Sequence, residues 1–270
     1  MQNLSENQKQ NSPMYISFCT QKGGAGKSVF TTLAASYLHY ECGYNVAVID
    51  CDYPQWSIHK LREREKEQIT KNGFYKKKAY ELCKKIGKRT YPVVPVQPET
   101  ALTKANEFLA TEEINYDLVL FDLPGTVNNK SVVELFFNMD YLFVPITTSR
   151  INMESTLNFI VTVSDIIQKN PQIRLKQVQT FWNRMTGRER QELYVAYENA
   201  MHELNIPIMQ IRIPQSVRYD REQSISGNDY LFLSTVFPPD KPLLKGSNWD
   251  LFMNDFLKLI NLQHNGNHSN

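Results

Sequence analysis

The sequence predicts an α/β fold built on a single doubly wound, mostly parallel sheet with helices on both faces. Short apolar runs alternate with longer segments of helical period, which is the order typical of parallel sheets with helical crossovers. Most of the runs are almost continuously apolar, as expected for strands that are covered on both faces. The 270 residues contain no internal repeat and no low-complexity linker, so one domain is expected.

Seven of the apolar runs are strand candidates, and helices are expected between them. The strand candidates are residues 15–19, 46–50, 93–96, 117–122, 141–146, 177–182 and 208–213. An apolar stripe that begins at Val29 and Phe30 predicts a helix that ends at Gly43. A second stripe at helical spacing contains Leu193, Ala196, Tyr197, Ala200, Met201 and Leu204. Segment 249–262 predicts a closing helix that packs on the body of the protein.

The folded domain is expected to cover residues 14–263, between disordered polar tails at 1–13 and 264–270. Within the domain, residues 57–90 predict a basic helical excursion on the surface. Positions 60–89 hold twelve Lys or Arg and four Glu, a net charge of +8, whereas the whole chain carries +2. The positive charge is therefore concentrated in one segment.

The composition disfavours several classes of protein. No stretch approaches the ~18 consecutive apolar residues of a membrane span, and the polar N-terminal segment lacks the apolar core of a signal peptide. The four cysteines form no CxxC pair, which argues against a disulfide framework, a zinc site and an iron–sulfur cluster. We therefore expect a cytoplasmic protein with no membrane attachment and no metal cluster.

The segment QKGGAGKS, residues 21–28, joins the first predicted strand to the first predicted helix. Glycines permit backbone conformations that point successive N–H groups at phosphate oxygens, and the helix adds the positive end of its dipole. In such a P-loop, Lys27 would reach the β- and γ-phosphates and the Ser28 hydroxyl would bind Mg²⁺. A glycine-rich turn with incidental lysines is the alternative, but the flanking strand and helix favour a site for ATP and Mg²⁺.

Three aspartates follow predicted strands: Asp50, Asp52 and Asp122. Open α/β sheets place their ligands at the carboxyl ends of the strands. Each aspartate alone is often a helix cap or a turn residue. Three of them behind a phosphate-binding loop favour a functional site, in which Asp122 holds Mg²⁺ and Asp50 supports the metal shell.

These motifs resemble those of the ParA/MinD family of ATPases. Gln21 stands where the usual GxxxxGK(S/T) spacing requires glycine, and the pattern present, KGGxGK(S/T), is the deviant Walker A of that family. Residues 50–55, DCDYPQ, resemble its DxDPQ segment with Tyr53 inserted, and 117–125 resemble its second switch. Residues 211–227 resemble its C-terminal tract. The ParA branch, including versions from plasmids and conjugative elements, is the most similar.

The resemblance implies a role for each matching residue. Lys22 would cross a dimer interface and neutralise charge as the phosphoryl group departs, and Asp52 would orient the attacking water. The catalytic residues implied in this way are Lys22, Lys27, Asp52 and Asp122. The implied metal-binding residues are Ser28, Asp50 and Asp122. The implied ATP contacts are Gly23, Gly24, Ala25, Gly26, Lys27, Ser28, Val29, Gly125, Asn183 and Pro214.

The second switch departs from the family pattern, and Asn183 has a simpler alternative to a nucleotide contact. The switch reads Leu123–Pro124–Gly125 where the family has Thr–Pro–Pro, and Gly125 would offer its N–H to the γ-phosphate. Asn183 would contact the base and Pro214 would pack beside the adenine. An asparagine after a strand is, however, often only a turn residue.

The resemblance also implies the biological activity. It implies a homodimer that forms on ATP binding, weak hydrolysis of ATP to ADP and phosphate, and activation by a ParB-like protein. Non-specific DNA binding in plasmid or mobile-element partitioning would follow, with salt-dependent affinity. Two basic sets are candidates for the DNA contact, unless each is only a solvated helix face. The first set is Lys76, Lys77, Lys78, Lys84 and Lys85, and the second is Arg184, Arg188, Arg190, Arg218 and Arg221.

Three rival functions follow from the same residues. The alternative is a nucleotide-dependent scaffold that positions a protein cargo, such as conjugation machinery, without DNA contact. A P-loop kinase or ligase would need an acceptor site, and none is evident. Membrane attachment through segment 249–262 is not expected, because Asp250 and Asp255 offset its single Lys258.

Overall fold

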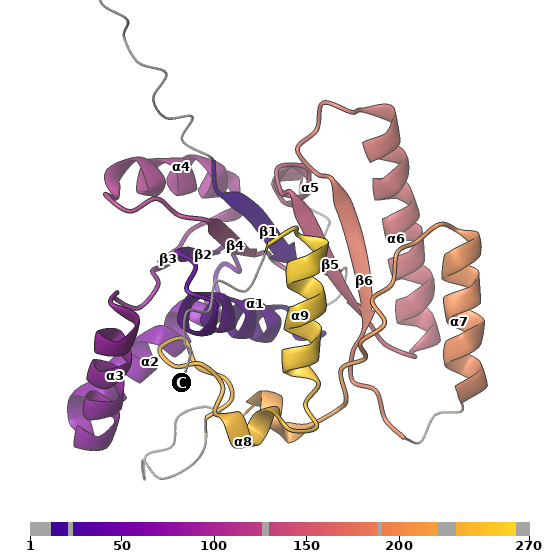
Figure 1. Cartoon of the computed structure of the whole chain (residues 1–270). Coiled ribbons are helices and arrows are strands. Elements are labelled where there is room, and N and C mark those ends of the chain that lie inside the picture. The colour runs from indigo at the N-terminus through magenta and orange to yellow at the C-terminus, as the bar shows by residue number, and fades with distance from the viewer. Residues whose placement is uncertain (1–11, 21–23, 126–129, 188–190, 221–230, 263–270) are drawn as a thin grey trace, which may run out of the picture.

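A six-stranded parallel sheet forms the centre of the computed structural model (Figure 1). The structure describes residues 12–20, 24–125, 130–187, 191–220 and 231–262. The strands are β1 (Met14–Phe18), β2 (Val46–Asp50), β3 (Val93–Pro95), β4 (Leu118–Asp122), β5 (Tyr141–Ile146) and β6 (Gln177–Trp182). They lie in the order β3-β2-β4-β1-β5-β6, and every neighbouring pair is parallel. The predicted fold class is confirmed.

The helices follow the strands along the chain. They are α1 (Lys27–Ser36), α2 (Ser57–Lys71), α3 (Gly73–Ile86), α4 (Ala101–Thr111), α5 (Lys130–Phe137), α6 (Arg150–Lys169), α7 (Gln191–Glu203), α8 (Lys241–Leu244) and α9 (Trp249–Leu259). A π-helical turn at Tyr37–Glu41 prolongs α1, and Gly43 follows in the left-handed conformation with φ 78°. The first helix therefore ends where the sequence predicts. None of the helices in the described ranges is long and apolar enough to span a membrane.

The seventh strand candidate, residues 208–213, is wrong as a strand. The segment runs beside β6, but it forms only isolated bridges, from Ile208 to Thr180 and from Pro214 to Met185. Because proline has no N–H to donate, Pro207 and Pro214 cannot extend the pairing beyond the two ends of the segment. The described sheet therefore ends at β6.

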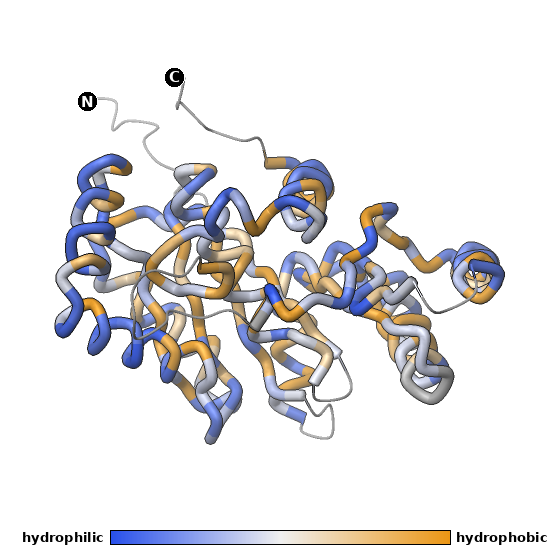
Figure 2. Tube along the Cα trace, turned by 90° about the horizontal axis from the view of Figure 1, so that it is seen from below, coloured by the Kyte–Doolittle hydropathy of each residue, from blue (hydrophilic) through white to orange (hydrophobic). Residues whose placement is uncertain are grey.

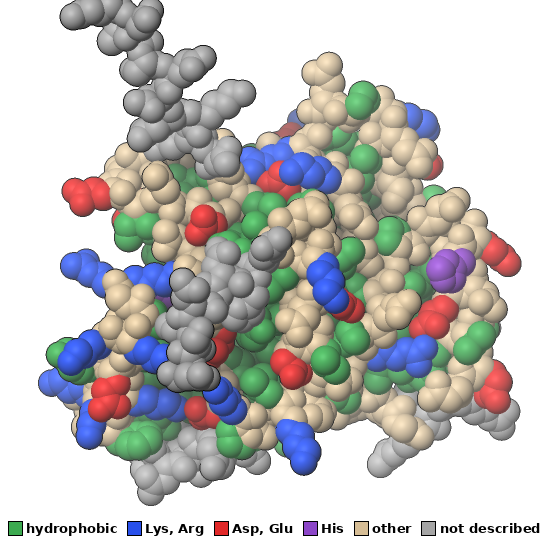
Figure 3. All heavy atoms as spheres, in the orientation of Figure 1, with side chains coloured by type: hydrophobic (Ala, Val, Ile, Leu, Met, Phe, Trp, Pro, Cys, Tyr) green, Lys and Arg blue, Asp and Glu red, His purple; other side chains and the backbone are tan. Residues whose placement is uncertain are grey.

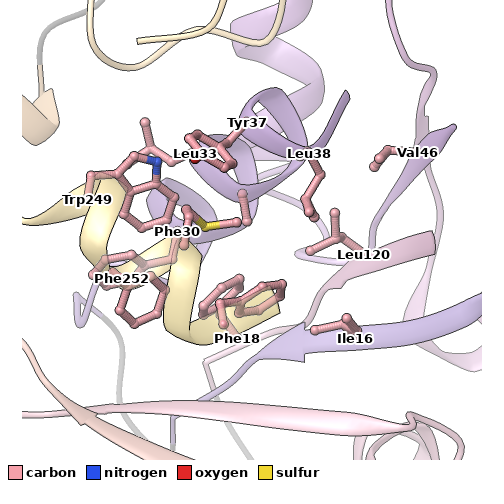
Figure 4. Close-up of a cluster of buried hydrophobic side chains, with 14 of the residues drawn as sticks. Ile16, Phe18, Phe30, Leu33, Tyr37, Leu38, Val46, Leu120, Trp249 and Phe252 are labelled. Carbon is pink, nitrogen blue, oxygen red and sulfur yellow. The ribbon is translucent and has the colours of Figure 1, made fainter. Parts of the chain in front are cut away.

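Two apolar clusters cover the two faces of the sheet. On one face, α9 packs its aromatic side chains against α1 and the inner strands, as Figure 4 shows for Phe18, Phe30 and Trp249. The rings of Phe256 and Phe143 lie 4.5 Å apart between centroids. The closing helix is thus packed on the body, as the sequence predicts. On the other face, buried side chains of α4, α5, α6 and α7 form the second cluster, and the tube in Figure 2 is most apolar where strands and inner helix faces meet.

Segment 57–90 folds as α2 and α3, and α2 is more deeply anchored than a surface excursion would be. Two of its charged side chains, Arg62 and Glu65, are buried. Glu65 accepts hydrogen bonds from the Ser234 hydroxyl and from the Thr235 hydroxyl and N–H. Arg62 donates to the Thr235 carbonyl at 2.8 Å and to the Tyr91 carbonyl at 2.7 Å. These contacts fasten α2 to a loop that is about 170 residues later in the chain.

The tails at 1–11 and 263–270 lie outside the described residues, so their predicted disorder remains a prediction.

Candidate nucleotide-binding site

The loop between β1 and α1 ends in two glycines with left-handed backbone conformations. Gly24 has φ 81° and Gly26 has φ 88°, a region that strongly favours glycine. A Cβ on Gly26 would also lie 3.3 Å from the Phe30 ring and 3.7 Å from the Asn183 side-chain nitrogen. No acidic residue and no side-chain cap occupies the first turn of α1. The N–H groups at this helix start are therefore not neutralised by a carboxylate of their own helix, which suits an anion. Lys22 and Gly23 lie outside the described residues.

Ser28 and Asp122 meet at the start of α1. The Ser28 hydroxyl donates a hydrogen bond of 2.6 Å to Asp122 Oδ2. The other carboxylate oxygen of Asp122, Oδ1, is buried and has no hydrogen-bond partner among the described residues. A buried carboxylate oxygen without a donor needs a water or a cation. This pair therefore fits Mg²⁺, which prefers oxygen ligands and keeps several waters.

Asp50, at the end of β2, accepts two backbone hydrogen bonds. Its Oδ2 accepts the His59 N–H at 2.9 Å, and its Oδ1 accepts the Asp52 N–H at 3.3 Å. Asp50 thus binds the first turn of α2. In the sheet, β2 and β4 are in register so that the backbone of Asp50 lies opposite that of Asp122. Asp52 is half-buried at the same edge of the sheet. Strands β2 and β4 therefore bring the three predicted aspartates together.

Burial raises the pKa of the carboxylates at this edge, and the charge of Lys27 lowers the pKa of Asp122 and Asp52. Burial raises the pKa of Asp122 to about 7, and the charge of Asp50 adds to the effect, whereas the Ser28 hydrogen bond and the Lys27 charge lower it. Burial also raises the pKa of Asp52, again opposed by Lys27. Lys27 is buried beside these groups. The site thus holds negative charge that a bound cation would stabilise.

We expect the stability of the nucleotide-free protein to depend on the protonation of Asp122. Its folded-state pKa of about 7 lies above the ordinary value of 3.8, so the protonated form is favoured in the folded protein. That contribution is fully present below about pH 4 and is lost as the pH rises through 7. With EDTA present, the melting temperature should fall from pH 5.5 to pH 8 more steeply for the parent than for Asp122→Asn. Equal slopes would contradict the assignment. Because Mg²⁺ binds the ionised form, Mg²⁺ affinity should rise over the same range.

A cavity of about 430 Å³ adjoins the end of the loop. Its lining residues are Gly26, Val29, Phe30, Asn183, Arg184, Pro214, Gln215, Ser216, Val217 and Tyr219. The cavity brings together the predicted base contacts Asn183 and Pro214 with Gly26 of the loop and Val29 of α1.

Asn183 supports the loop as well as lining the cavity. Its Nδ2 donates to the Ala25 carbonyl at 2.9 Å, and its Oδ1 accepts the Arg184 N–H at 2.8 Å. Arg184 and Tyr219 also line the cavity, and neither is among the ATP contacts predicted from the sequence. Arg184 has φ 56°, an uncommon conformation for this residue type, and no sequence signal marks it. Gly125 follows β4 three residues after Asp122, at the same edge of the sheet.

Residues 16–225 match the model of a protein family described as the CobQ/CobB/MinD/ParA nucleotide binding domain. The chain belongs to this family. The predicted relationship to ParA and MinD proteins is therefore confirmed.

Solved structures of the CobQ/CobB/MinD/ParA family share this fold over most of the chain. The MinD cell division protein of Aquifex aeolicus is 16% identical, with 93% of this chain and 98% of that chain covered and a TM-score of 0.57. A ParA family ATPase from Chlorobium tepidum TLS is 14% identical, with 91% and 98% covered and a TM-score of 0.53. An ATP complex of a Cyanothece McdA variant is 14% identical, with 93% and 97% covered and a TM-score of 0.52. A comparison with curated protein sequences finds no significant match.

Proposed function

We propose that this chain is a cytoplasmic, ATP-dependent switch that forms a homodimer on binding ATP and hydrolyses ATP slowly to ADP and phosphate. The contact of Ser28 with Asp122 supports this most directly. The second carboxylate oxygen of Asp122 has no donor among the described residues and is buried near Lys27. Family membership and the ATP complex of McdA, a protein of similar fold, support the choice of ATP.

The chain's own residues divide the work of the proposed reaction. The α1 amides and Lys27 bind the phosphates, and Asp52 positions the attacking water from the end of β2. Lys22 acts on the nucleotide of the partner subunit. Ser28 and Asp122 hold Mg²⁺, which when bound supplies charge neutralisation at the phosphates. Within the described ranges, no group of three His, Cys, Asp or Glu side chains forms a metal site unaided, so the remaining ligands would be phosphate oxygens and water.

Analytical sedimentation with ADP or a non-hydrolysable ATP analogue, each with and without DNA, tests the switch. We expect a monomer with ADP and a dimer with the analogue. The same oligomeric state with ADP and with the analogue would contradict the proposal.

Replacing Lys22 by alanine is expected to leave ATP affinity within about twofold of the parent and to lower turnover roughly a hundredfold or more, as for a charge that acts only in the transition state. Nucleotide titration and single-turnover phosphate release measure the two effects separately. Normal hydrolysis in this variant would remove Lys22 from the mechanism.

We further propose that non-specific DNA binds the exposed face of α3 when the ATP dimer forms. On α2, Lys66 and Lys71 pair with Glu63 and Glu67 of their own helix, at 2.7 and 2.5 Å. Among the described residues, Lys76, Lys84 and Lys85 are the α3 lysines without such close partners. Figure 3 shows basic side chains gathered over α2 and α3 at the left of the molecule.

Two members of the second basic set have other contacts. Arg218 donates to the Lys245 carbonyl, and Arg184 lines the cavity beside Gly26. The other three members, Arg188, Arg190 and Arg221, lie outside the described residues. Lys78 of the first set is also engaged, with Asp240 at 3.0 Å.

A gel shift with ATP at low and moderate salt tests the DNA contact. The double variant Lys84→Ala/Lys85→Ala should bind DNA at least tenfold more weakly, and its salt slope should fall by roughly 0.9 for each phosphate that the variant no longer neutralises. Lys104→Ala is the control, because Lys104 is exposed on α4 and paired with Glu107. If the double variant still shifts all of the DNA, the DNA contact does not lie at Lys84 and Lys85. No shift by the parent at any salt would favour the scaffold for a protein cargo, and activation by a ParB-like protein would then lose its basis.

A further inference from the structure

Helix α7 carries an apolar stripe that the described chain covers only in part. Leu193 is 37% exposed and Leu204, just after the helix, is 49% exposed. Ala196 between them is exposed as well, and Ala200 is half-buried. Figures 1 and 2 place α7 at the right-hand edge of the molecule, beyond β6. These are positions at which the sequence predicts a packed helix face.

The helix is anchored along only one side of its apolar surface. Tyr194 and Met201 are buried in the second core cluster, and the Tyr194 ring meets Trp182 edge-on at 4.9 Å. At 3.6 residues per turn, Leu193 and Leu204 lie within roughly 40° of one another, whereas Tyr194 and Met201 lie roughly 60–100° further round. The outer part of the surface is thus continuous with the anchored part but is only partly covered by the described residues. A row of apolar side chains at this spacing is typical of a helix that packs on another element.

The charges beside the stripe indicate what could cover it. Glu192 and Glu203 are exposed and fall on the same side of the stripe, and α7 contains no lysine or arginine. The third glutamate, Glu198, is occupied on the inner side by Trp182 Nε1 and by Arg212, each at 2.7 Å. The negative end of the helix dipole adds to the acidic border. An anionic membrane would be repelled, and two antiparallel copies of α7 would set the same acidic border against itself.

We propose that the α7 stripe (Leu193, Ala196, Ala200 and Leu204) is the docking surface for an amphipathic helix of a protein partner, whose own apolar stripe is bordered by lysine or arginine. The alanines in the middle of the stripe let a partner helix approach closely, and the leucines at its ends interlock with its side chains. The basic border of the partner meets Glu192 and Glu203, which sets the direction and specificity of docking. This surface is separate from the nucleotide site, and its use does not depend on hydrolysis.

The test uses the full chain without nucleotide and two synthetic 18-residue helical peptides with the same leucine stripe. One peptide carries lysines beside the stripe and the other carries glutamates. Fluorescence anisotropy at about 50 mM salt should show at least tenfold tighter binding of the lysine peptide. Leu193→Gln and Leu204→Gln should each weaken that binding at least fivefold. Val195→Gln is the matched control, because Val195 is 50% exposed on the opposite side of α7 and should leave binding unchanged.

Three results would overturn the proposal. The first is equal binding of the two peptides, and the second is an equal loss of binding in the Val195→Gln control. The third is self-association of the free chain that disappears in Leu204→Gln, because that result would assign the stripe to a second copy. Thermal unfolding confirms that each variant is folded. Because no nucleotide is present, failure of the ATP switch would leave these outcomes unaffected.

Discussion

Replacement of Lys27 by alanine is expected to weaken ATP binding roughly a hundredfold or more. Lys27 is buried at the first position of α1, and its charge acts on the carboxylates of Asp52 and Asp122. A triphosphate placed at the helix start would lose its only buried lysine partner among the described residues, next to carboxylates that repel it. Loss of one member of a buried, hydrogen-bonded charge pair costs about 2–5 kcal/mol, and about 2.7 kcal/mol corresponds to a hundredfold.

Equilibrium titration with a fluorescent ATP analogue in the presence of Mg²⁺ measures this effect. Lys66→Ala is the matched control, since Lys66 is an exposed lysine of α2 that pairs only with Glu63 among the described side chains. The control should bind as the parent does. If Lys27→Ala binds ATP with parental affinity, the phosphates are held elsewhere and the site proposed here is wrong.

The second large effect is expected on stability, from Glu65→Ala. Glu65 is 1% exposed and accepts three hydrogen bonds from Ser234 and Thr235. Its removal leaves those donors without an acceptor and leaves the Arg62 guanidinium buried without a nearby carboxylate. Breaking a buried charge network in this way costs about 3–5 kcal/mol of the free energy of unfolding.

Urea denaturation of the two proteins measures the loss, and the melting temperature should fall by roughly 6 °C or more. Glu63→Ala on the same helix is the control. Glu63 is exposed and pairs with Lys66, so its removal should change the free energy of unfolding by less than about 1 kcal/mol. A loss in Glu65→Ala no larger than in Glu63→Ala would show that the loop is held by its apolar residues alone.

The strands were the most predictable part of the fold. Runs such as 118–122 are buried at every position, so their apolar character is almost uninterrupted and no other element fits them. Segment 208–213 contains Gln210 and Arg212 and is less uniformly apolar, and it pairs with β6 only at isolated points. The α7 stripe shows a second limit, since periodicity reveals an apolar surface but not which part of it is covered.

The phosphate loop and the three aspartates were predictable because fixed spacing, glycines and strand ends each carry a physical requirement. The partners of Arg62 and Glu65 were not. Alternating charges on a helix usually indicate solvated pairs, and Lys66 and Glu63 on α2 are of that kind. Glu65 differs because Ser234 and Thr235, in a distant loop, donate hydrogen bonds to it. A local sequence pattern cannot reveal such a pairing.

The distance along the chain between Glu65 and Thr235 has a consequence for the order of folding. A ribosome adds 5–20 residues each second. About 170 residues separate Glu65 from Thr235, so α2 is synthesised roughly ten to thirty seconds before the hydrogen-bond donors of Ser234 and Thr235. Throughout that interval Glu65 and Arg62 lack the partners at Ser234 and Thr235. The last fastening of α2 therefore follows synthesis of the carboxy-terminal quarter.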